Sequence, residues 1–301
     1  MTDPNIQNLY NEYYYATGCG APYCRNEHWT TFFGHIANQI VTSIGPQRVL
    51  DAGCALGLLV EQLHLRGVEV AGVDISEYAI NTAPESIRPL LRIGSITEPF
   101  GQRYDLIVCI EVLEHMPRAA AEQAVINFCQ HSDDILFSSS PLDFKEATHC
   151  NVQPIEYWAD LFARQGFVRD VDFDASFLTP WAIRFRRSSE PLHRIVRDYE
   201  RRFWELWKAN TDLRELAVEQ RQQMEALNQQ VQHLTTALQM TTDQMHAQYQ
   251  QLTTEHHAYT ARIEQDLAVK INHIQQLKLA LERLESGRVM RIMRAFTRRL
   301  R

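Results

Sequence analysis

Glycine and proline are missing from a long part of this sequence of 301 residues. Eleven of the 12 glycines and ten of the 11 prolines lie before Pro191, and neither residue occurs between Leu192 and Ser286. Since both residues interrupt regular backbone structure, their absence excludes a second loop-rich domain in that stretch. Hydrophobic residues make up 45% of the chain, which is enough to bury a substantial core. We therefore expect one globular unit followed by one long helix.

The sequence also has no long apolar run and no overall excess of positive charge. No run reaches the roughly 18 apolar residues of a membrane span. The first four residues lack the basic and apolar parts of a signal peptide, so we expect a cytoplasmic protein with reduced thiols. A net charge of -7 argues against a partner that is nucleic acid. The last 14 residues differ, with six arginines and no acid, which favours a local anionic partner.

Strand-like and helix-like patterns alternate in the first two thirds of the chain. Apolar runs of strand length occur at 48–53, 68–73, 91–93, 104–110, 134–138, 167–173 and 181–186. Helical patterns fall between them, at 58–65, after Ser76, at 117–129 and at 154–165. This alternation predicts an α/β fold with a seven-stranded, mostly parallel sheet, helices on both faces and an antiparallel pair at the end. Ligands bind such sheets at the carboxyl ends of the strands.

Glycine and acidic residues follow the first two predicted strands. Asp51 and Gly53 end the first strand, Gly57 opens the next helix, and Asp74 ends the second strand. Gly53 can adopt a positive φ and lets the backbone approach a ligand, while Asp74 is suited to holding both hydroxyls of a ribose. The G-x3-G spacing differs from the G-x-G-x-x-G loop that cradles a pyrophosphate. A cofactor without phosphates is therefore favoured over the dinucleotide of a nicotinamide oxidoreductase.

Three motifs together carry a family resemblance. They are VLDAGCALG at 49–57, GVDIS at 72–76 and YDLIVCIEVLEHMP at 104–117. The chain from about Tyr13 to Arg187 thus resembles class I S-adenosylmethionine-dependent methyltransferases, and the E-V-L-E-H-x-P stretch is the most specific part. The resemblance implies a Rossmann-like fold with S-adenosyl-L-methionine as the cofactor. The cofactor-binding residues that it implies are Asp51, Gly53, Cys54, Gly57, Asp74, Ile75, Ser95, Ile96, Ile110 and Glu111.

The resemblance also implies roles within this set. Asp51 and Gly53 would hold the methionine moiety and Asp74 the ribose, while Ile75 would pack on the adenine. Family members often have glycine where Ala55 stands and an acid where Ser95 stands. These two departures leave room for an alternative function, in which the domain is degenerate and the chain acts as a coiled-coil scaffold or spacer.

Further segments refine the resemblance. PYCR at 22–25, His28–Trp29 and THCNVQP at 148–154 resemble methyltransferases of bacterial surface-polysaccharide gene clusters. By this analogy the methyl acceptor is a hydroxyl of a saccharide or of a lipid-linked glycan, or another small molecule. We therefore expect an O-methyltransferase of polysaccharide biosynthesis.

An alcohol acceptor needs a base, and histidine has a suitable pKa. His149 lies in the loop after the fifth strand and is the favoured base, with Asn151 beside it as a substrate-binding residue. His115, after the fourth strand, is the second candidate. The alternatives are that His115 orders its loop and that His149 is an exposed loop residue. A His149→Ala variant with full turnover would exclude His149.

Near the start of the chain we expect a tyrosine-rich lid or, equally well, a packed arm. Tyr15 is its predicted substrate-binding residue, and Arg25 would meet a carboxylate or phosphate of the acceptor. No metal is predicted, because Cys19, Cys24 and His28 lack a fourth ligand.

Apolar residues recur at alternating spacings of three and four between Met224 and Tyr259. Thr241, Gln248 and Glu255 interrupt this seam, which shifts near Ile263 and resumes from Ile274. The repeat predicts a coiled coil that forms a homo-oligomer, as a dimer or trimer. The alternative is a helix folded back on the globular unit.

Gly287 ends the predicted rod. After it, five apolar residues share one helical face among arginines: Val289, Ile292, Met293, Phe296 and Leu300. This pattern is typical of a helix on an anionic membrane surface, which would make the protein peripheral at the inner membrane face. A solvated tail and a partner-binding helix are the alternatives. The expected segments are an N-terminal helical arm or lid (1–46), a methyltransferase domain (47–188), a coiled-coil helix (190–286) and a basic amphipathic tail (287–301).

Overall fold

A computed structural model describes residues 9–18 and 22–299 of the chain. The chain divides into two compact units, with the division after Lys208. The globular unit thus includes the first turns of the long helix, beyond the boundary near residue 188 that the sequence predicted. Cys19 of the cysteine pattern and Leu300 of the basic tail lie outside the described residues.

A seven-stranded sheet forms the centre of the globular unit. Its strands are β1 (Arg48–Ala52), β2 (Glu69–Asp74), β3 (Leu91–Ile93), β4 (Leu106–Ile110), β5 (Asp134–Ser138), β6 (Phe167–Arg169) and β7 (Ile183–Arg187). They lie in the order β3-β2-β1-β4-β5-β7-β6. The first five strands of this order are parallel, and β7 is antiparallel to both of its neighbours. This confirms the predicted Rossmann-like, mostly parallel sheet.

One predicted strand was too long. The sequence predicted a strand over 167–173, whereas β6 ends at Arg169. The chain turns there, because the Phe173 N–H donates to the Asp170 carbonyl and the Asp170 N–H donates to the Arg184 carbonyl. The β6–β7 pairing therefore closes after three residues of β6.

Helices cover both faces of the sheet, and the central strands β1, β4 and β5 contribute alternate residues to the two cores. Leu106 and Val108 of β4 join one core, and Ile107 and Cys109 join the other. Such two-sided burial explains why these strands read as continuous apolar runs. The helices are α3 (Glu27–Ser43), α4 (Leu58–His64), α5 (Glu77–Thr82), α6 (Arg118–His131) and α7 (Ile155–Arg164).

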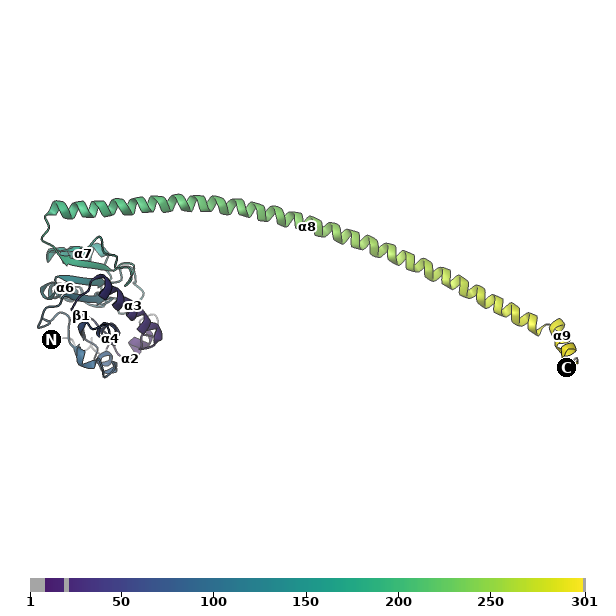
Figure 1. Cartoon of the computed structure of the whole chain (residues 1–301), viewed down its shortest axis with the longest axis horizontal. Coiled ribbons are helices and arrows are strands. Elements are labelled where there is room, and N and C mark those ends of the chain that lie inside the picture. Colours follow the sequence, from purple (N-terminus) through teal and green to yellow (C-terminus); the bar gives the residue numbers. More distant parts are fainter. Residues whose placement is uncertain (1–8, 19–21, 300–301) are drawn as a thin grey trace. The chain divides into compact units, whose positions relative to one another are not determined.

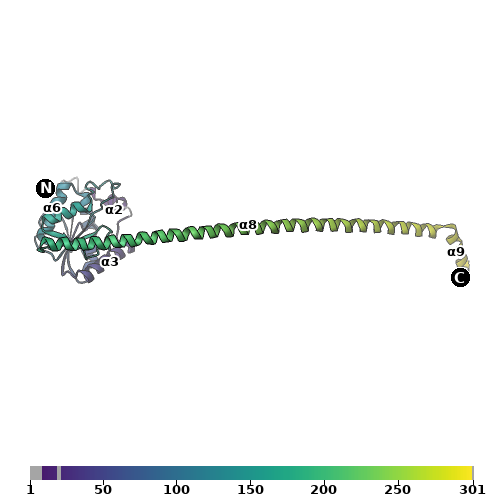
Figure 2. The ribbon, with the colours of Figure 1, turned by 90° about the horizontal axis from the view of Figure 1, so that it is seen from above.

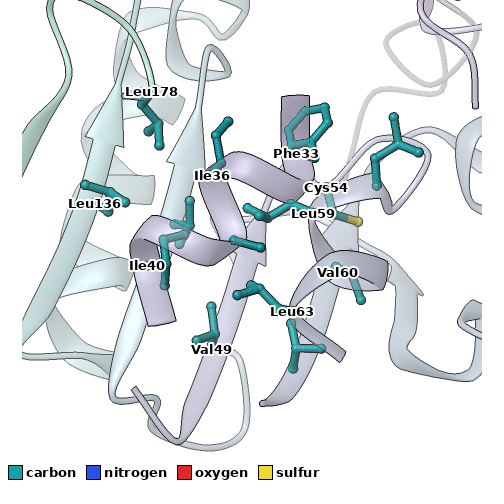
Figure 3. Close-up of a cluster of buried hydrophobic side chains, with 14 of the residues drawn as sticks. Phe33, Ile36, Ile40, Val49, Cys54, Leu59, Val60, Leu63, Leu136 and Leu178 are labelled. Atoms are coloured by element: carbon teal, nitrogen blue, oxygen red, sulfur yellow. The ribbon is translucent and has the colours of Figure 1, made fainter. Parts of the chain in front are cut away.

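The packing of α3 on α4 makes much of the first core. Ile36 and Ile40 of α3 lie beside Leu59 and Leu63 of α4, above Val49 of β1 (Figure 3). Residues of α6 and α7, among them Phe128 and Trp158, build the second core. A short helix, α2 (Glu12–Thr17), precedes α3 and is capped by the side chain of Asn11.

The long helix α8 runs without a break from Leu192 to Ser286 (Figure 1). This confirms the helix that the absence of glycine and proline predicted, and the view from above shows the same continuity (Figure 2). Gly287 separates it from α9 (Arg288–Arg299), as expected. Within the described residues, no helix combines the length and the apolar character that a membrane span needs.

Candidate active site

A cavity of about 850 Å³ opens at the carboxyl ends of the parallel strands of the globular unit. Chain order reverses between β1 and β4, so the loops after these two strands diverge and leave space between them. The volume lies in the usual range for small-molecule sites. Of the ten predicted cofactor-binding residues, nine line the cavity: Asp51, Gly53, Cys54, Asp74, Ile75, Ser95, Ile96, Ile110 and Glu111.

Gly57 is the tenth predicted residue, and it does not line the cavity. It lies in the left-handed region at the start of α4, with a φ of 71°. An added Cβ would come within 2.9 Å of a Leu91 side-chain carbon, so this glycine allows α4 to pack against β3. Its role is therefore in packing.

Backbone geometry at Gly53 brings the loop after β1 close to the cavity. Gly53 has a φ of 87°, and an added Cβ would lie 2.3 Å from a methyl carbon of Val112. Any side chain here would clash as well as strain the backbone. Ala55 also has a positive φ, of 46°, although it is not glycine. Ala55 therefore keeps the left-handed turn that glycine would adopt more easily.

The Asp74 carboxylate is fixed by backbone groups. Its Oδ2 accepts from the Ala55 N–H at 2.8 Å and its Oδ1 from the Ser76 N–H at 2.8 Å. Burial raises the pKa of Asp74, and these backbone donors oppose the shift. The carboxylate is thus held at the edge of the cavity with lone pairs left for hydroxyl donors.

Asp51 is a buried carboxyl group without a positive partner. Asp51 is 4% exposed and lines the cavity. Its carboxyl group forms no hydrogen bond or ion pair with any residue that the structure describes. Burial, with the nearby charge of Asp74, raises the pKa of Asp51 to about 8. A cation in the cavity would restore the carboxylate. The site therefore fits a ligand with an ammonium group.

The loop after β3 is held by a residue that sequence analysis missed. Asn127 of α6 is buried, and its side-chain amide donates to the carbonyls of Ile96 at 2.8 Å and Glu98 at 2.6 Å. Ser95 accepts from the Thr97 N–H and bonds to the Thr97 hydroxyl. The only signal in the sequence was a polar residue on an otherwise apolar helix face.

Both candidate bases line the same cavity. The His115 and His149 rings lie 4.5 Å apart, and their side chains are 11% and 5% exposed. Burial and the charge of His149 lower the pKa of His115 to about 4. The sequence prediction that His149 lies at the mouth of the site is therefore correct in position, but its ring is buried.

Hydrogen bonds assign the proton positions on His115. Thr148 donates its hydroxyl to Glu146 Oε1 at 2.5 Å, so it must accept from His115 Nδ1, which lies 2.9 Å away. The proton is therefore on Nδ1, and Nε2 carries the lone pair. Nε2 has no hydrogen-bond partner among the described residues.

Both nitrogens of His149 are engaged. Nδ1 donates to the Asp143 carbonyl at 2.7 Å, because a carbonyl can only accept, and Nε2 lies 3.2 Å from Glu146 Oε2. Oxygen and nitrogen atoms of Asp143, Glu146 and His149 also lie within 4.8 Å of one another. This is a donor set of the kind that holds a divalent cation. The expectation that no metal is bound stays a prediction.

Glu114, within the E-V-L-E-H motif, holds the loop after β5 in place through hydrogen bonds. It is fully buried, and its two oxygens accept from the Ser139 hydroxyl and the Ser140 N–H, both at 3.0 Å. Burial and the nearby Glu111 raise its pKa to about 8. Asn151 was predicted to bind substrate, but it does not line the cavity. Its side chain donates to the Leu113 carbonyl, and its backbone N–H donates to the Glu114 carbonyl.

An N-terminal arm closes one side of the cavity. The Tyr10 carbonyl accepts from the Ser76 hydroxyl at 2.5 Å, and the Tyr14 hydroxyl donates to Glu146 at 3.4 Å. Tyr15, a predicted substrate residue, is buried in the cavity wall. The aromatic side chains of α3 that also line the wall were not predicted: Trp29, Phe32 and Phe33.

Arg25 does not contact the cavity. Its guanidinium forms a two-pronged ion pair with Glu61 of α4, at 2.7 and 3.2 Å. Arg25 was predicted to bind the acceptor, and the structure instead places its guanidinium on the Glu61 carboxylate. The pair ties the segment before α3 to α4, so Arg25 has no charge left for an acceptor.

Comparison with known proteins agrees with this geometry. Residues 26–170 match the model of a family described as methyltransferase domain. The ubiquinone biosynthesis O-methyltransferase of Alkalilimnicola ehrlichii is 30% identical over 110 residues, which are 34% of this chain and 44% of that protein. Its counterpart from Dechloromonas aromatica is 32% identical over 95 residues, 29% of this chain and 40% of the relative. The chain thus spans less than half the length of these relatives.

Among solved structures, magnesium protoporphyrin IX methyltransferase from Synechocystis with bound S-adenosylmethionine is similar, with a TM-score of 0.47 and 19% identity. The match covers 62% of this chain and 100% of that one.

The fold, the glycine loop and the family match define a class I S-adenosylmethionine-dependent methyltransferase domain. Residues 26–170 match such a domain, whose cofactor is S-adenosyl-L-methionine, and the long helix α8 follows it in the chain.

Proposed function

We propose that this protein transfers the methyl group of S-adenosylmethionine to a hydroxyl oxygen of a small acceptor. The observation that carries the proposal is the unpartnered Asp51 carboxyl beside Gly53 and Asp74, in the same cavity as the lone pair of His115. The same cavity thus has groups for the cofactor and a base for the acceptor.

The cofactor side follows from the contacts already described. Asp51 would bind the ammonium group of the methionine moiety, Asp74 would accept from the ribose hydroxyls, and Ile75 would pack on the adenine. When bound, the cofactor supplies a methyl group on a positively charged sulfur, which is a good leaving group. The protein then has to align the acceptor with that methyl group and take its proton.

His115 is the base that the hydrogen bonds favour. Its Nε2 would take the acceptor proton while Nδ1 keeps its bond to Thr148. The positive ring that results is stabilised by Glu146 through the Thr148 hydroxyl. His149 was the base favoured from the sequence, but both of its nitrogens already have partners. We therefore assign His149 to positioning Glu146, and His115 to proton removal.

The acceptor that we propose is a hydroxyl of a saccharide or lipid-linked glycan. Two features of the cavity support it: carboxylates that can accept from sugar hydroxyls, Asp143 and Glu146, and aromatic rings that can cover the apolar face of a sugar, Tyr23 and Trp29. The relatives named above are O-methyltransferases of ubiquinone biosynthesis, so a planar phenolic acceptor is the second candidate. The aromatic wall would accommodate it as well.

The test is transfer of a labelled methyl group from S-adenosylmethionine to a panel of glycans and phenols by the full chain. We expect a labelled ether on one acceptor class, with loss of transfer in His115→Gln. Transfer to amines alone, or transfer by His115→Gln at the native rate, would contradict the proposal. A chain that binds the cofactor but methylates no acceptor of either class would favour the scaffold alternative, which the intact cofactor side argues against.

We also propose that α8 mediates self-association. Its apolar residues are exposed along its length, including Leu227 at 59% and Leu238 at 68%. A single helix cannot bury such a stripe, so a second helix is expected to cover it.

For α9 we propose contact with an anionic membrane surface, with the protein peripheral at the inner face of the membrane. Val289, Ile292 and Met293 share one exposed face, at 72%, 57% and 56%. Arginines flank them at 288, 291 and 294, and α9 contains no acid. Each basic residue near an anionic surface contributes about 1 kcal/mol.

A further inference from the structure

The seam of apolar residues on α8 begins earlier in the helix than Met224, where the sequence pattern placed its start. Counting back from Tyr259 in alternating steps of four and three reaches Leu192, the first residue of the helix, without a change of phase. In the usual heptad notation the a positions are 196 and every seventh residue to 259. The d positions are 192 and every seventh residue to 255. The repeat therefore begins inside the globular unit, whose last residue is Lys208.

The globular unit leaves this first part of the seam uncovered. Val196 and Phe203, at a positions, are 48% and 67% exposed. Arg201, at an outward f position, pairs with Asp172 at 2.8 Å, and Tyr199, at a d position of the seam, accepts from the Arg169 N–H through its hydroxyl. The domain therefore contacts the seam only at its edge, through the Tyr199 hydroxyl, and leaves Val196 and Phe203 exposed for a partner helix.

The residues in the seam favour two parallel strands. The d positions from 206 to 234 are leucine except for Gln220, and valine occupies a positions 196 and 231. Branched residues at a with leucine at d are typical of parallel dimers. Asn210 is the one polar residue at an a position, and such an asparagine specifies register and strand number.

The positions that flank the seam permit the same pairing. Between residues 223 and 258, the e and g positions carry glutamine, asparagine, threonine, alanine, tyrosine and histidine, with no acid, lysine or arginine. Two copies in register therefore meet no like-charge repulsion across these positions. A second copy of this chain therefore offers a matching apolar seam from Leu192 to Leu238, while the d positions 241, 248 and 255 are polar and weaken the seam near its end.

We propose that α8 pairs with α8 of a second copy as a parallel, in-register, two-stranded coiled coil from Leu192 to Tyr259. This deepens the self-association proposed above and rests on it. Because the seam starts at the first residue of α8, both globular units attach at the same end of the coil. Both α9 helices then follow from the other end, so that a membrane surface would meet two basic helices together.

Two measurements on the full chain test the proposal. Light scattering after size exclusion should give twice the 34.9 kDa mass of one chain. For orientation, Leu252→Cys and its control Gln250→Cys are made in a background in which the exposed Cys24 and Cys150 are serine. Position 252 is an a position far from the midpoint of the seam, and position 250 is an outward f position. We expect mild oxidation to crosslink Leu252→Cys into covalent dimers and to leave Gln250→Cys as single chains.

The outcomes separate the two levels of the proposal. A monomeric mass at all concentrations would overturn self-association itself. A trimeric mass, or a dimer in which Leu252→Cys fails to crosslink, would overturn the parallel pairing and leave self-association in place. Asn210→Val gives an independent check. It should raise the midpoint temperature of unfolding of α8 and add larger oligomers, whereas the control Gln229→Val, at an outward f position, should do neither.

Discussion

At the scale of single residues, the assignment of the base depends on where protons lie. The bond from Thr148 to Glu146 fixes the tautomer of His115, and the Asp143 carbonyl fixes that of His149. Two histidines in contact thus have different chemistry. His115 keeps a lone pair, whereas His149 has both nitrogens bound.

This difference predicts the pH profile of kcat/KM for the acceptor. Because burial lowers the pKa of His115 to about 4, its lone pair is present at neutral pH and is lost only as pH falls through about 4. We expect a rate that is flat between about pH 5 and 8 and declines below that range, measured with saturating cofactor. A decline centred near 6.5, the ordinary histidine value, would point to a base other than His115. His149→Gln removes a charge that lowers the pKa of His115, so it should move the decline toward higher pH.

The sequence predicted the cofactor side of the site better than the acceptor side. Asp51, Gly53 and Asp74 follow adjacent strands, so strand order alone brings them together. Arg25 and Asn151 were predicted to face the acceptor, but their partners Glu61 and Leu113 lie 36 and 38 residues away in sequence. No local pattern shows such pairings, since they depend on tertiary packing.

At the scale of elements, the loop after β3 is held by α6, a helix that follows β4 in the chain. Asn127 of α6 supplies the amide that holds the Ile96 and Glu98 carbonyls. The boundaries of the parallel strands were predictable because their two-sided burial gives clear apolar runs. The end of β6 was not, because it depends on a turn that bonds to β7.

Replacing Asn127 by alanine should weaken both folding and cofactor binding. Leaving the buried Ile96 carbonyl unpaired costs about 1–3 kcal/mol, whereas water can reach the Glu98 carbonyl. We expect the free energy of unfolding in urea to fall by at least about 1 kcal/mol, with lower cofactor affinity, because Ser95 and Ile96 line the cavity. Asn38→Ala, at an exposed position of α3, is the control and should change neither quantity. An unchanged affinity in Asn127→Ala would show that the loop does not contact the cofactor.

At the scale of the whole molecule, a methyltransferase domain, a long helix and a basic helix follow one another in one chain. The continuity of α8 was predictable, because a missing breaker is a strong signal over 95 residues. The partner of α8 was not predictable. An exposed apolar stripe indicates that another surface covers it, but the stripe alone does not identify that surface.

Binding of the full chain to lipid vesicles tests the proposed role of α9. We expect sedimentation with vesicles that contain anionic lipid, weakened by salt because the attraction is screened. Ile292→Asp should reduce binding, since it places a charge in the exposed apolar face. Gln275→Asp, on α8, adds the same charge elsewhere and serves as the control. Equal losses in the two variants would mean that net charge alone, and not the face of α9, governs binding.

The central claim is that the cavity binds S-adenosylmethionine through Asp51, and calorimetric titration tests it most directly. The pKa of Asp51 is raised to about 8, so at pH 7 most of the free protein carries a neutral Asp51, and pairing with an ammonium releases its proton. We predict saturable binding with an enthalpy that depends on the ionisation enthalpy of the buffer. In Asp51→Asn this dependence should vanish and the affinity should fall at least about tenfold. Absence of binding, or equal affinity with equal proton release in the variant, would contradict the account.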